Sequence, residues 1–386
     1  VCSSDLGLLL LAAGVLFAGK LSAQAVVTAT GVGPGPVSYG TLKAAFDAIN
    51  AGTHQGAITV TIGASGTTET VTPQLNSGAT LPASYSSVLI KPAAGTTPTI
   101  QGNISNNAIV YLRGVSNVTI DGSNTTGGTT KDLTIVNTNG GLGNHAVVRL
   151  GAASTLLGNT NVTVKNCNIN GITGFSLCHG VIVGTGTGTV ALVNAEAANS
   201  GVTVQNNSFA NMGRAVMCLG NTGGLDQNTT ISGNTANNLL FTGFDMRYQN
   251  NMIISGNTIT NVNNGLAGVT PNTQGILLNG TVNGSITNNS LTNVMNNGAA
   301  GGGAYGIYLF AFTGSNITVA NNIINDVKSQ STTSTAANSA FGIFVGQGNG
   351  YNIYYNTINM ATGSVAGFPA PIGFAGTLPA SAVTVR

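Results

Sequence analysis

Two short strand patterns follow one another in Asn107-Ala-Ile-Val-Tyr-Leu-Arg-Gly-Val-Ser-Asn-Val-Thr-Ile-Asp-Gly122, and both recur along the chain. The first pattern is any residue, then Gly or Ala, then three mostly apolar residues and a turn. Its copies follow at steps of 28 to 38 residues and begin at Asn107, His145, His179, Arg214, Thr242, Gln274, Tyr305 and Phe341. Constant strands joined by loops of variable length are typical of a solenoid.

The second pattern follows each copy of the first. It begins at Asn117, Asn161, Gly201, Asn228, Asn251, Asn283 and Asn316. A third segment then starts at a column of Asn residues, whose first slot holds Cys167: Asn207, Asn234, Asn257, Asn289, Asn322 and Asn356. Each coil therefore holds three short β-branched strands separated by Asn and Gly turns. Stacked Asn side chains can donate to one neighbour and accept from the other, so we expect a structural ladder along this column.

The composition fits such a stack. The chain has 56 Gly, 48 Asn and 50 Thr in 386 residues, but only 11 Lys and Arg and 9 Asp and Glu. Its 5% of charged residues compares with about 25% in a typical soluble domain. This scarcity excludes a coiled coil, and the scattered basic residues argue against nucleic-acid binding. Like charges repeated at the spacing of a solenoid would repel one another, whereas Asn, Thr and Gly can stack.

These features resemble the right-handed parallel β-helix of the pectate-lyase-like superfamily, with three strands per coil, over residues 38 to 386. Residues 41–52 place Leu42, Ala45, Phe46 and Ile49 on one helical face, as a helix capping the first coil would. Strands at 58–62 and 88–90 then begin the stack. The run at 117–122 looks like secreted bacterial surface proteins with β-helix repeats, many of which carry a C-terminal sorting domain. The fold class predicted is therefore all-β.

The two ends indicate export and truncation. Residues 6–18 form an apolar run that is followed by Ala23-Gln24-Ala25, which is typical of a secretory signal peptide and too short for a membrane span. The first six residues resemble an artefact, and residues 381–386 begin a strand that the repeat pattern continues. We expect a signal peptide (1–25), a cap with the first coils (26–105) and truncated β-helix repeats (106–386), in a secreted or outer-surface protein.

The cysteines do not have the number or spacing of a disulfide framework. Setting aside Cys2 leaves Cys167, Cys178 and Cys218, an odd number without metal-ligand spacing, so we expect small buried side chains. Pairing of Cys178 with Cys218 in an exported protein stays open. We expect no metal and no cofactor.

A charged patch is the candidate catalytic site. Alternation along the first pattern places its fourth position outward, at Val110, Val148, Ile182, Met217, Asp245, Leu277, Tyr308 and Phe344. Asp245 is the only ionisable residue in that column, and Arg247 lies two residues further on the same face. His179 and Arg214 precede them in neighbouring coils, and His145 is expected to stack on His179. Arg149 falls on a nominally inward position, so we expect a bulge that turns it outward.

This patch is incomplete for known chemistry. Glycoside hydrolysis needs two carboxylates and a calcium-dependent lyase needs several, whereas Asp245 has no acidic neighbour in its column. A solvated ion pair between Asp245 and Arg247 is the simpler interpretation. Asp226 lies in a loop whose position the sequence does not fix. The Gly-Thr-Gly-Thr-Gly run at 184–188 lacks the helix that a nucleotide site requires and is predicted to be a loop.

Aromatic residues suggest a binding surface towards the C-terminal end. Tyr305, Tyr308, Phe310 and Phe344 are candidate ligand-binding residues, with Tyr351 and Tyr355 as further members, because aromatic faces on a rigid solenoid suit stacking on sugar rings. Coverage by the loop at 329–340 is the alternative. The sequence therefore favours a non-catalytic scaffold in adhesion or in binding of polysaccharides or cell-surface glycans. The alternative is a polysaccharide lyase or glycoside hydrolase with its site around Asp245.

Overall fold

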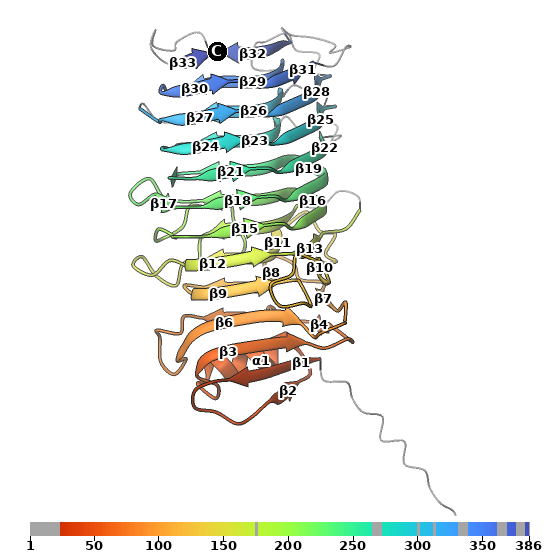
Figure 1. Ribbon diagram of the computed structural model, residues 1–386, viewed down its shortest axis with the longest axis vertical. Coiled ribbons are helices and arrows are strands. Elements are labelled where there is room, and N and C mark those ends of the chain that lie inside the picture. Colours follow the sequence, from red (N-terminus) through yellow and green to blue (C-terminus); the bar gives the residue numbers. More distant parts are fainter. Residues whose placement is uncertain are drawn as a thin grey trace, which may run out of the picture.

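The protein folds into a stack of coils, each of which contributes one strand to each of three parallel stacks (Figure 1). This arrangement confirms the predicted parallel β-helix with three strands per coil. The computed structural model describes residues 24–173, 177–264, 272–298, 302–311, 314–330, 339–360, 369–375 and 383–385. The apolar run of the predicted signal peptide lies outside these residues, and the first strand begins at Ala25.

The first stack contains the strands of the second sequence pattern and forms a sheet of its own. Its parallel members are β3 (Gly56–Ile62), β6 (Tyr85–Pro92), β9 (Ser116–Asp121), β12 (Thr160–Lys165), β15 (Thr203–Gln205), β18 (Thr230–Ser232), β21 (Ile253–Ser255), β24 (Gly284–Thr287), β27 (Ile317–Ala320), β30 (Tyr351–Tyr354) and β33 (Val383–Val385). Two antiparallel strands, β1 (Ala25–Ala29) and β2 (Val37–Tyr39), extend it at the N-terminal end. The strands predicted at 58–62 and 88–90 are confirmed as parts of β3 and β6.

The second stack follows the Asn column. Its strands are β4 (Thr67–Glu69), β7 (Thr99–Gly102), β10 (Leu133–Asn137), β13 (Cys167–Asn170), β22 (Thr258–Asn264), β25 (Ser290–Asn296), β28 (Ile323–Ser329) and β31 (Thr357–Asn359). Two longer strands, β16 (Ser208–Leu219) and β19 (Thr235–Arg247), bend at the corner and continue into the third stack.

The third stack contains the strands of the first sequence pattern. These are β5 (Gln74–Asn76), β8 (Ala108–Arg113), β11 (His145–Gly151), β14 (Cys178–Gly184), the second halves of β16 and β19, β23 (Thr273–Asn279), β26 (Ala304–Phe310), β29 (Ala340–Gln347) and β32 (Ala370–Phe374). A separate pair of short strands, β17 (Asp226–Gln227) and β20 (Gln249–Asn250), lies between the third and first stacks.

From β15 to β29 each coil turns at three corners, and left-handed residues make these turns. In the coil that contains β15 and β16, Asn206, Asn211 and Asn228 have φ angles of 50°, 60° and 58°. Asn tolerates this backbone conformation better than larger residues do, because its short polar side chain bonds locally. The abundance of Asn therefore follows in part from the number of corners.

The predicted Asn ladder is confirmed. Its members, from Asn207 to Asn356, are buried except for the last, which is half-buried. The side-chain oxygen of each rung accepts from the backbone N–H of the preceding rung at 2.9–3.0 Å and from its amide at 2.9–3.1 Å. Cys167, in the first slot, donates its backbone N–H to Asn207 at 3.0 Å. The ladder thereby satisfies buried polar groups at the corner without charge.

A helix closes the N-terminal end of the stack, as predicted (Figure 1). Helix α1 (Leu42–Asn50) begins after Thr41, whose hydroxyl oxygen accepts from the N–H of Ala44 at 3.1 Å. Its buried face consists of the four apolar residues that the sequence singled out. Buried Glu69 accepts from the N–H groups of Leu42 at 2.8 Å and Lys43 at 3.1 Å, which fixes the helix N-terminus to β4.

The interior is one apolar core that runs from Ala25 to Ile353. Cys167, Cys178 and Cys218 are buried free thiols, as the composition predicted, so Cys178 and Cys218 do not pair. Burial raises the pKa of Cys178 to about 12, which keeps this thiol protonated and unreactive at neutral pH. Among the described residues, no helix has the length and hydropathy that a membrane span requires.

Candidate functional site

The outward face of the third stack carries most of the residues that the sequence singled out. Strand register places one column along it: Tyr111, Arg149, Ile182, Met217, Asp245, Leu277, Tyr308 and Phe344. The prediction for the first two coils was wrong by one residue, because Val110 and Val148 lie in the core. These strands are apolar on both faces, so their alternation fits either register.

The same shift separates the two histidines. His145 is the register partner of Cys178, whereas His179 pairs with Ala146 on one side and with Arg214 on the other. The predicted stacking of His145 on His179 is therefore wrong.

Arg149 points outward without the bulge that we expected, because it is the register partner of Ile182. Its guanidinium donates to the carbonyl oxygens of Thr185 at 2.9 Å and Gly188 at 3.0 Å, and it lies 4.5 Å from the centre of the Tyr111 ring. Burial lowers the pKa of Arg149. This cation holds the predicted loop at 184–188 against the stack, and Asp245 is not the only ionisable residue in its column.

The structure brings the four candidate catalytic residues together. Arg247 holds both carboxylate oxygens of Asp245, with Nε to Oδ1 and Nη2 to Oδ2 both at 2.8 Å. Arg214 Nε lies 3.6 Å from Oδ2 of the same carboxylate and over the Phe241 ring at 5.2 Å. The expected ion pair forms, but it is not solvated, since only 1% of the Asp245 side chain is exposed.

His179 completes this cluster as a neutral residue. It is fully buried beside Arg214, and neither of its ring nitrogens has a hydrogen-bond partner among the described residues. Burial, assisted by the positive charge of Arg214, holds the pKa of His179 well below its ordinary value. The catalytic role that the sequence assigned to these four residues stays a prediction.

The geometry of this cluster restricts its chemistry. The Arg247 guanidinium contacts both carboxylate oxygens of Asp245, so neither oxygen can act on a substrate unless this ion pair opens. The other acid nearby in sequence, Asp226, lies in a buried row of amides. Its hydrogen-bond partners are Asn199 and Gln249, and among the described residues it forms no hydrogen bond with Asp245. Across the described ranges, no three His, Cys, Asp or Glu residues are placed to hold a metal ion.

The predicted aromatic surface forms a packed cluster. Tyr305 stacks on Tyr308 with ring centres 4.7 Å apart, and Phe341 and Phe344 are also 4.7 Å apart. Tyr305, Phe341 and Phe344 are buried, whereas Tyr308 and Phe310 are half-buried. Most of the loop expected to cover them, residues 331–338, lies outside the described residues. Ligand binding by these aromatics stays a prediction, with Tyr308 and Phe310 as the members that keep accessible surface.

The two remaining aromatic candidates, Tyr351 and Tyr355, differ in where their side chains lie. Tyr351 points inward, and its hydroxyl donates to the carbonyl oxygen of Gln347 at 2.6 Å, so its assignment to the binding surface is wrong. Tyr355 is exposed at a corner of the coil.

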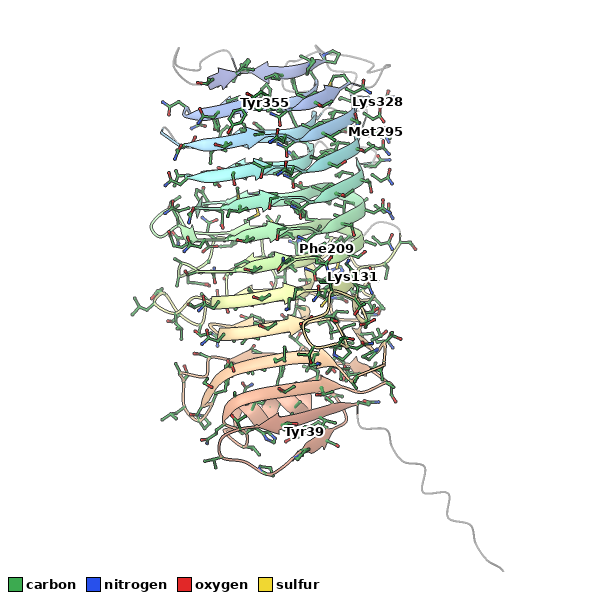
Figure 2. The ribbon with its side chains drawn as sticks, in the orientation of Figure 1. Tyr39, Lys131, Phe209, Met295, Lys328 and Tyr355 are labelled. Carbon is green, nitrogen blue, oxygen red and sulfur yellow. The ribbon has the colours of Figure 1, made fainter. Side chains whose placement is uncertain are left out.

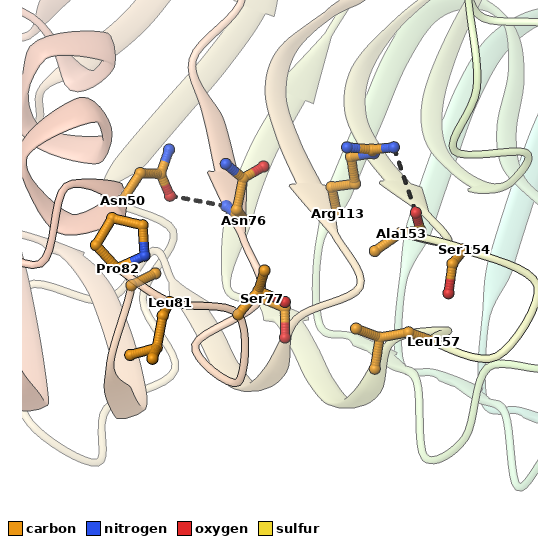
Figure 3. A pocket seen from close by; sticks show the side chains of 11 residues that line it. Asn50, Asn76, Ser77, Leu81, Pro82, Arg113, Ala153, Ser154 and Leu157 are labelled. Atoms are coloured by element: carbon orange, nitrogen blue, oxygen red, sulfur yellow. Dashed lines mark hydrogen bonds between the residues drawn. The ribbon is translucent and has the colours of Figure 1, made fainter.

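A groove near the N-terminal end was not predicted (Figure 3). Its volume is about 370 Å³. Asn76 and Arg113, register neighbours at the ends of β5 and β8, form its floor. The loops 77–84 and 152–158 form its walls, with Leu81 and Pro82 on one side and Leu157 on the other. The sequence signal for this groove was weak: a charged residue directly after an apolar strand and before a left-handed Gly114.

The Arg113 groove offers hydrogen-bond donors. Arg113 Nη2 donates to the carbonyl oxygen of Ala153 at 3.3 Å, which orients the guanidinium along one wall. The hydroxyl oxygens of Ser77 and Ser154 accept from backbone N–H groups at 3.2 Å, so their protons point elsewhere. The lining contains no carboxylate. Such a site suits a ligand rich in acceptors.

Comparison with known proteins identifies the fold. Residues 191–368 match the family model described as right handed beta helix region, in agreement with the predicted handedness. No curated protein sequence matches the chain.

Three solved structures illustrate the range of similar chains. An alginate lyase from Paenibacillus sp. str. FPU-7 is 10% identical, with 86% of this chain and 96% of that chain covered and a TM-score of 0.48. PfbA, a surface adhesin of Streptococcus pneumoniae, is 14% identical, with 88% and 90% covered and a TM-score of 0.45. The enzymatically active domain of bacteriophage CBA120 tailspike protein 2 is 12% identical, with 89% and 44% covered and a TM-score of 0.46. No function follows for this chain from likenesses at this level.

Proposed function

We propose that this chain, which is a right-handed parallel β-helix protein, is an exported scaffold that binds glycans at a cell surface without cleaving them. The observation that carries the proposal is the state of Asp245. Arg247 occupies both of its oxygens at 2.8 Å, and the side chain is almost fully buried. The one carboxylate that sequence reasoning placed in an outward column is therefore committed to a structural ion pair.

Cleavage would require more than this cluster provides. Hydrolysis of a glycosidic bond uses a second carboxylate within about 5–9.5 Å of the first, to act as acid or as base. The partners of Asp245 are instead the cations Arg247 and Arg214. The rigid stack of parallel strands, by contrast, favours binding, because a repeated surface presents polar side chains at fixed spacing along a linear polymer.

A glycan panel tests the proposal. We expect the purified protein to retain at least one glycan on an array, with no new reducing ends and no ultraviolet absorbance from unsaturated ends after prolonged incubation. Turnover that is lost in Asp245→Asn, with the fold intact by circular dichroism, would establish the alternative of a lyase or hydrolase. Absence of binding to every glycan on the panel would contradict the scaffold proposal.

Export is part of the proposal, and its support is the apolar run at 6–18 followed by Ala-x-Ala. The expected result is a protein that reaches the outside of an expressing bacterium and has lost its N-terminal segment. Mass spectrometry of the exported chain would give the cleavage position, and retention of the full chain in the cytoplasm would contradict export.

A further inference from the structure

We propose that the Arg113 groove binds one negatively charged sugar residue of a glycan, with its carboxylate or sulfate group facing Arg113. This inference rests on the proposed glycan binding and assigns a position and a ligand class to it. The site lies at the N-terminal end of the stack, between loops 77–84 and 152–158, and it shares no lining residue with the Asp245 cluster.

Charge is the first argument. Among the described residues, four ion pairs are formed, and none of them includes Arg113. The half-buried guanidinium donates to the Ala153 carbonyl oxygen and also interacts with the Tyr111 side chain, and neither partner carries a negative charge. A cation that is oriented but not neutralised attracts an anion, and the planar fork of Arg matches carboxylate and sulfate groups through two parallel bonds.

The polar side chains around Arg113 also favour an anionic ligand. Asn76 Oδ1 accepts from Gln74 Nε2 at 2.7 Å, which leaves the Asn76 amide N–H₂ as the unused half of the side chain. Ser77 and Ser154 use their oxygens as acceptors and keep their O–H donors. With no Asp or Glu in the lining, the groove supplies donors to a ligand and few acceptors. An anionic, oxygen-rich group fits this pattern better than a cation or an amine.

The apolar walls distinguish a sugar from a bare anion. Leu81 and Pro82 face Leu157 across the groove (Figure 3), and the C–H face of a pyranose ring can pack against such side chains. A volume of about 370 Å³ lies at the lower end of the range for small-molecule sites, about 300–1,000 Å³. The groove therefore takes one ring with its substituents rather than a long segment.

A second groove, although larger at about 660 Å³, is less suited to an anion. Its two cations are already engaged: Lys165 lies 3.1 Å from the Asp121 carboxylate, and Lys131 Nζ donates to Asn206 Oδ1 at 3.0 Å. An incoming anion would have to displace these partners. The Arg113 groove carries no such cost.

Calorimetric titration with matched ligands tests the inference. One pair is a uronate-containing oligosaccharide and its carboxyl-reduced form, and the other is a sulfated oligosaccharide and its desulfated form. The protein variants are Arg113→Gln, which keeps donors but removes the charge, and Lys328→Gln as a control. Lys328 lies near the opposite end of the stack (Figure 2) and forms no ion pair among the described residues.

We expect the wild-type protein to bind one charged ligand at least tenfold more tightly than its neutral counterpart. Arg113→Gln should abolish that difference, and Lys328→Gln should preserve it. The ligand pair that shows the loss identifies the anion as carboxylate or sulfate, and either result supports the inference. If Arg113→Gln does not fold, Ser154→Trp, which fills the groove from an exposed position, should cause the same loss.

Two results would overturn the inference. If Arg113→Gln and Ser154→Trp bind the charged ligands as tightly as the wild-type protein, glycan binding stands but lies elsewhere. An equal loss of affinity in Lys328→Gln would show that binding follows net charge rather than this groove. If no oligosaccharide on the wider panel is bound, the proposed function falls and takes this inference with it.

Discussion

Two buried rows of polar side chains line two corners of the coils, and they differ in how their hydrogen bonds are directed. The Asn ladder between the first and second stacks uses one residue type throughout. The row between the third and first stacks, which we call the mixed row, contains Asn159, Asn199, Asp226 and Gln249. The first row shows what repetition alone can build, and the second shows what happens when the repetition is interrupted.

In the Asn ladder all bonds have the same direction. Each rung donates to the oxygen of the next rung towards the C-terminus and accepts from the rung before it. Each amide also donates to a strand carbonyl oxygen, as Asn257 does to Ile231 at 2.9 Å. An amide has both a donor side and an acceptor side, so such a ladder can be extended by any number of coils.

In the mixed row donors meet from both sides at Asp226. Asn199 donates to Oδ1 through its backbone N–H at 2.7 Å and its amide at 3.1 Å, and Gln249 Nε2 donates to Oδ2 at 3.2 Å. Gln249 cannot reverse its amide cheaply, because Thr229 donates to its oxygen at 2.7 Å. A residue between two donors must be an acceptor on both sides, and a carboxylate meets this requirement. The reversal of direction therefore introduces a buried charge.

Removing a rung of the Asn ladder should have the largest effect. Asn257→Ala takes away the acceptor of the Asn234 N–H and of its amide, and the donor to Ile231. A buried polar group without a partner costs roughly 1–3 kcal/mol, so we expect a loss of about 4 kcal/mol in the free energy of unfolding. Urea denaturation followed by circular dichroism would measure it.

An exposed Asn provides the matched control. Asn251 donates to Asn228 at 2.6 Å in a second, solvent-facing column, and it has a φ of 57°. Asn251→Gly keeps this conformation, and water replaces the lost bond, so we expect a change below about 1 kcal/mol. Equal losses in both variants would mean that burial does not determine the strength of the ladder.

The mixed row should make stability depend on pH. Burial raises the pKa of Asp226 from 3.8 to about 6, although its hydrogen bonds act in the opposite direction. Between these two values the folded chain binds more protons at Asp226 than the unfolded chain does. The contribution of Asp226 is therefore fully present below pH 3.8 and is lost as the pH rises through 6, by about 3 kcal/mol in all.

Asp226→Asn isolates this contribution from the other acids. The difference in unfolding free energy between the wild-type protein and the variant, measured from pH 3 to pH 8, should change by about 3 kcal/mol across the window from 3.8 to 6. The part of this difference that does not change with pH measures the cost of the new contact between two amide donors, at positions 226 and 249. A difference that stays constant with pH would contradict a titrating rung.

Repetition also decided what the sequence could predict. The Asn ladder was predictable because each rung follows a β-branched strand. The residue before each rung makes the turn: half-buried Asn206 has a left-handed φ of 50°, and Asn207 then enters the ladder. The register of His145 and Arg149 was not predictable, because their strand is apolar on both faces and the preceding loop varies in length. The Arg113 groove depends on two loops without repeats. The direction of the Gln249 amide, which explains why a carboxylate stands at position 226, depends on Thr229, which directly precedes β18.

The exposed column beside the Asn ladder allows the smallest test. Its residues are left-handed, with φ of 56° at Asn288 and Asn321, and Tyr355 occupies the same position with φ of 56°. This conformation raises the free energy of a large residue by about 1–2 kcal/mol, and it raises that of Asn by less. Tyr355 is 74% exposed and contacts Tyr354 edge-on, so little packing is lost on replacement. Tyr355→Asn should therefore raise the free energy of unfolding by about 1 kcal/mol, and the reverse exchange, Asn288→Tyr, should lower it by a similar amount. A loss of stability in Tyr355→Asn would show that the ring contact outweighs the strained backbone, and that this corner is held by packing rather than by the conformational preference of Asn.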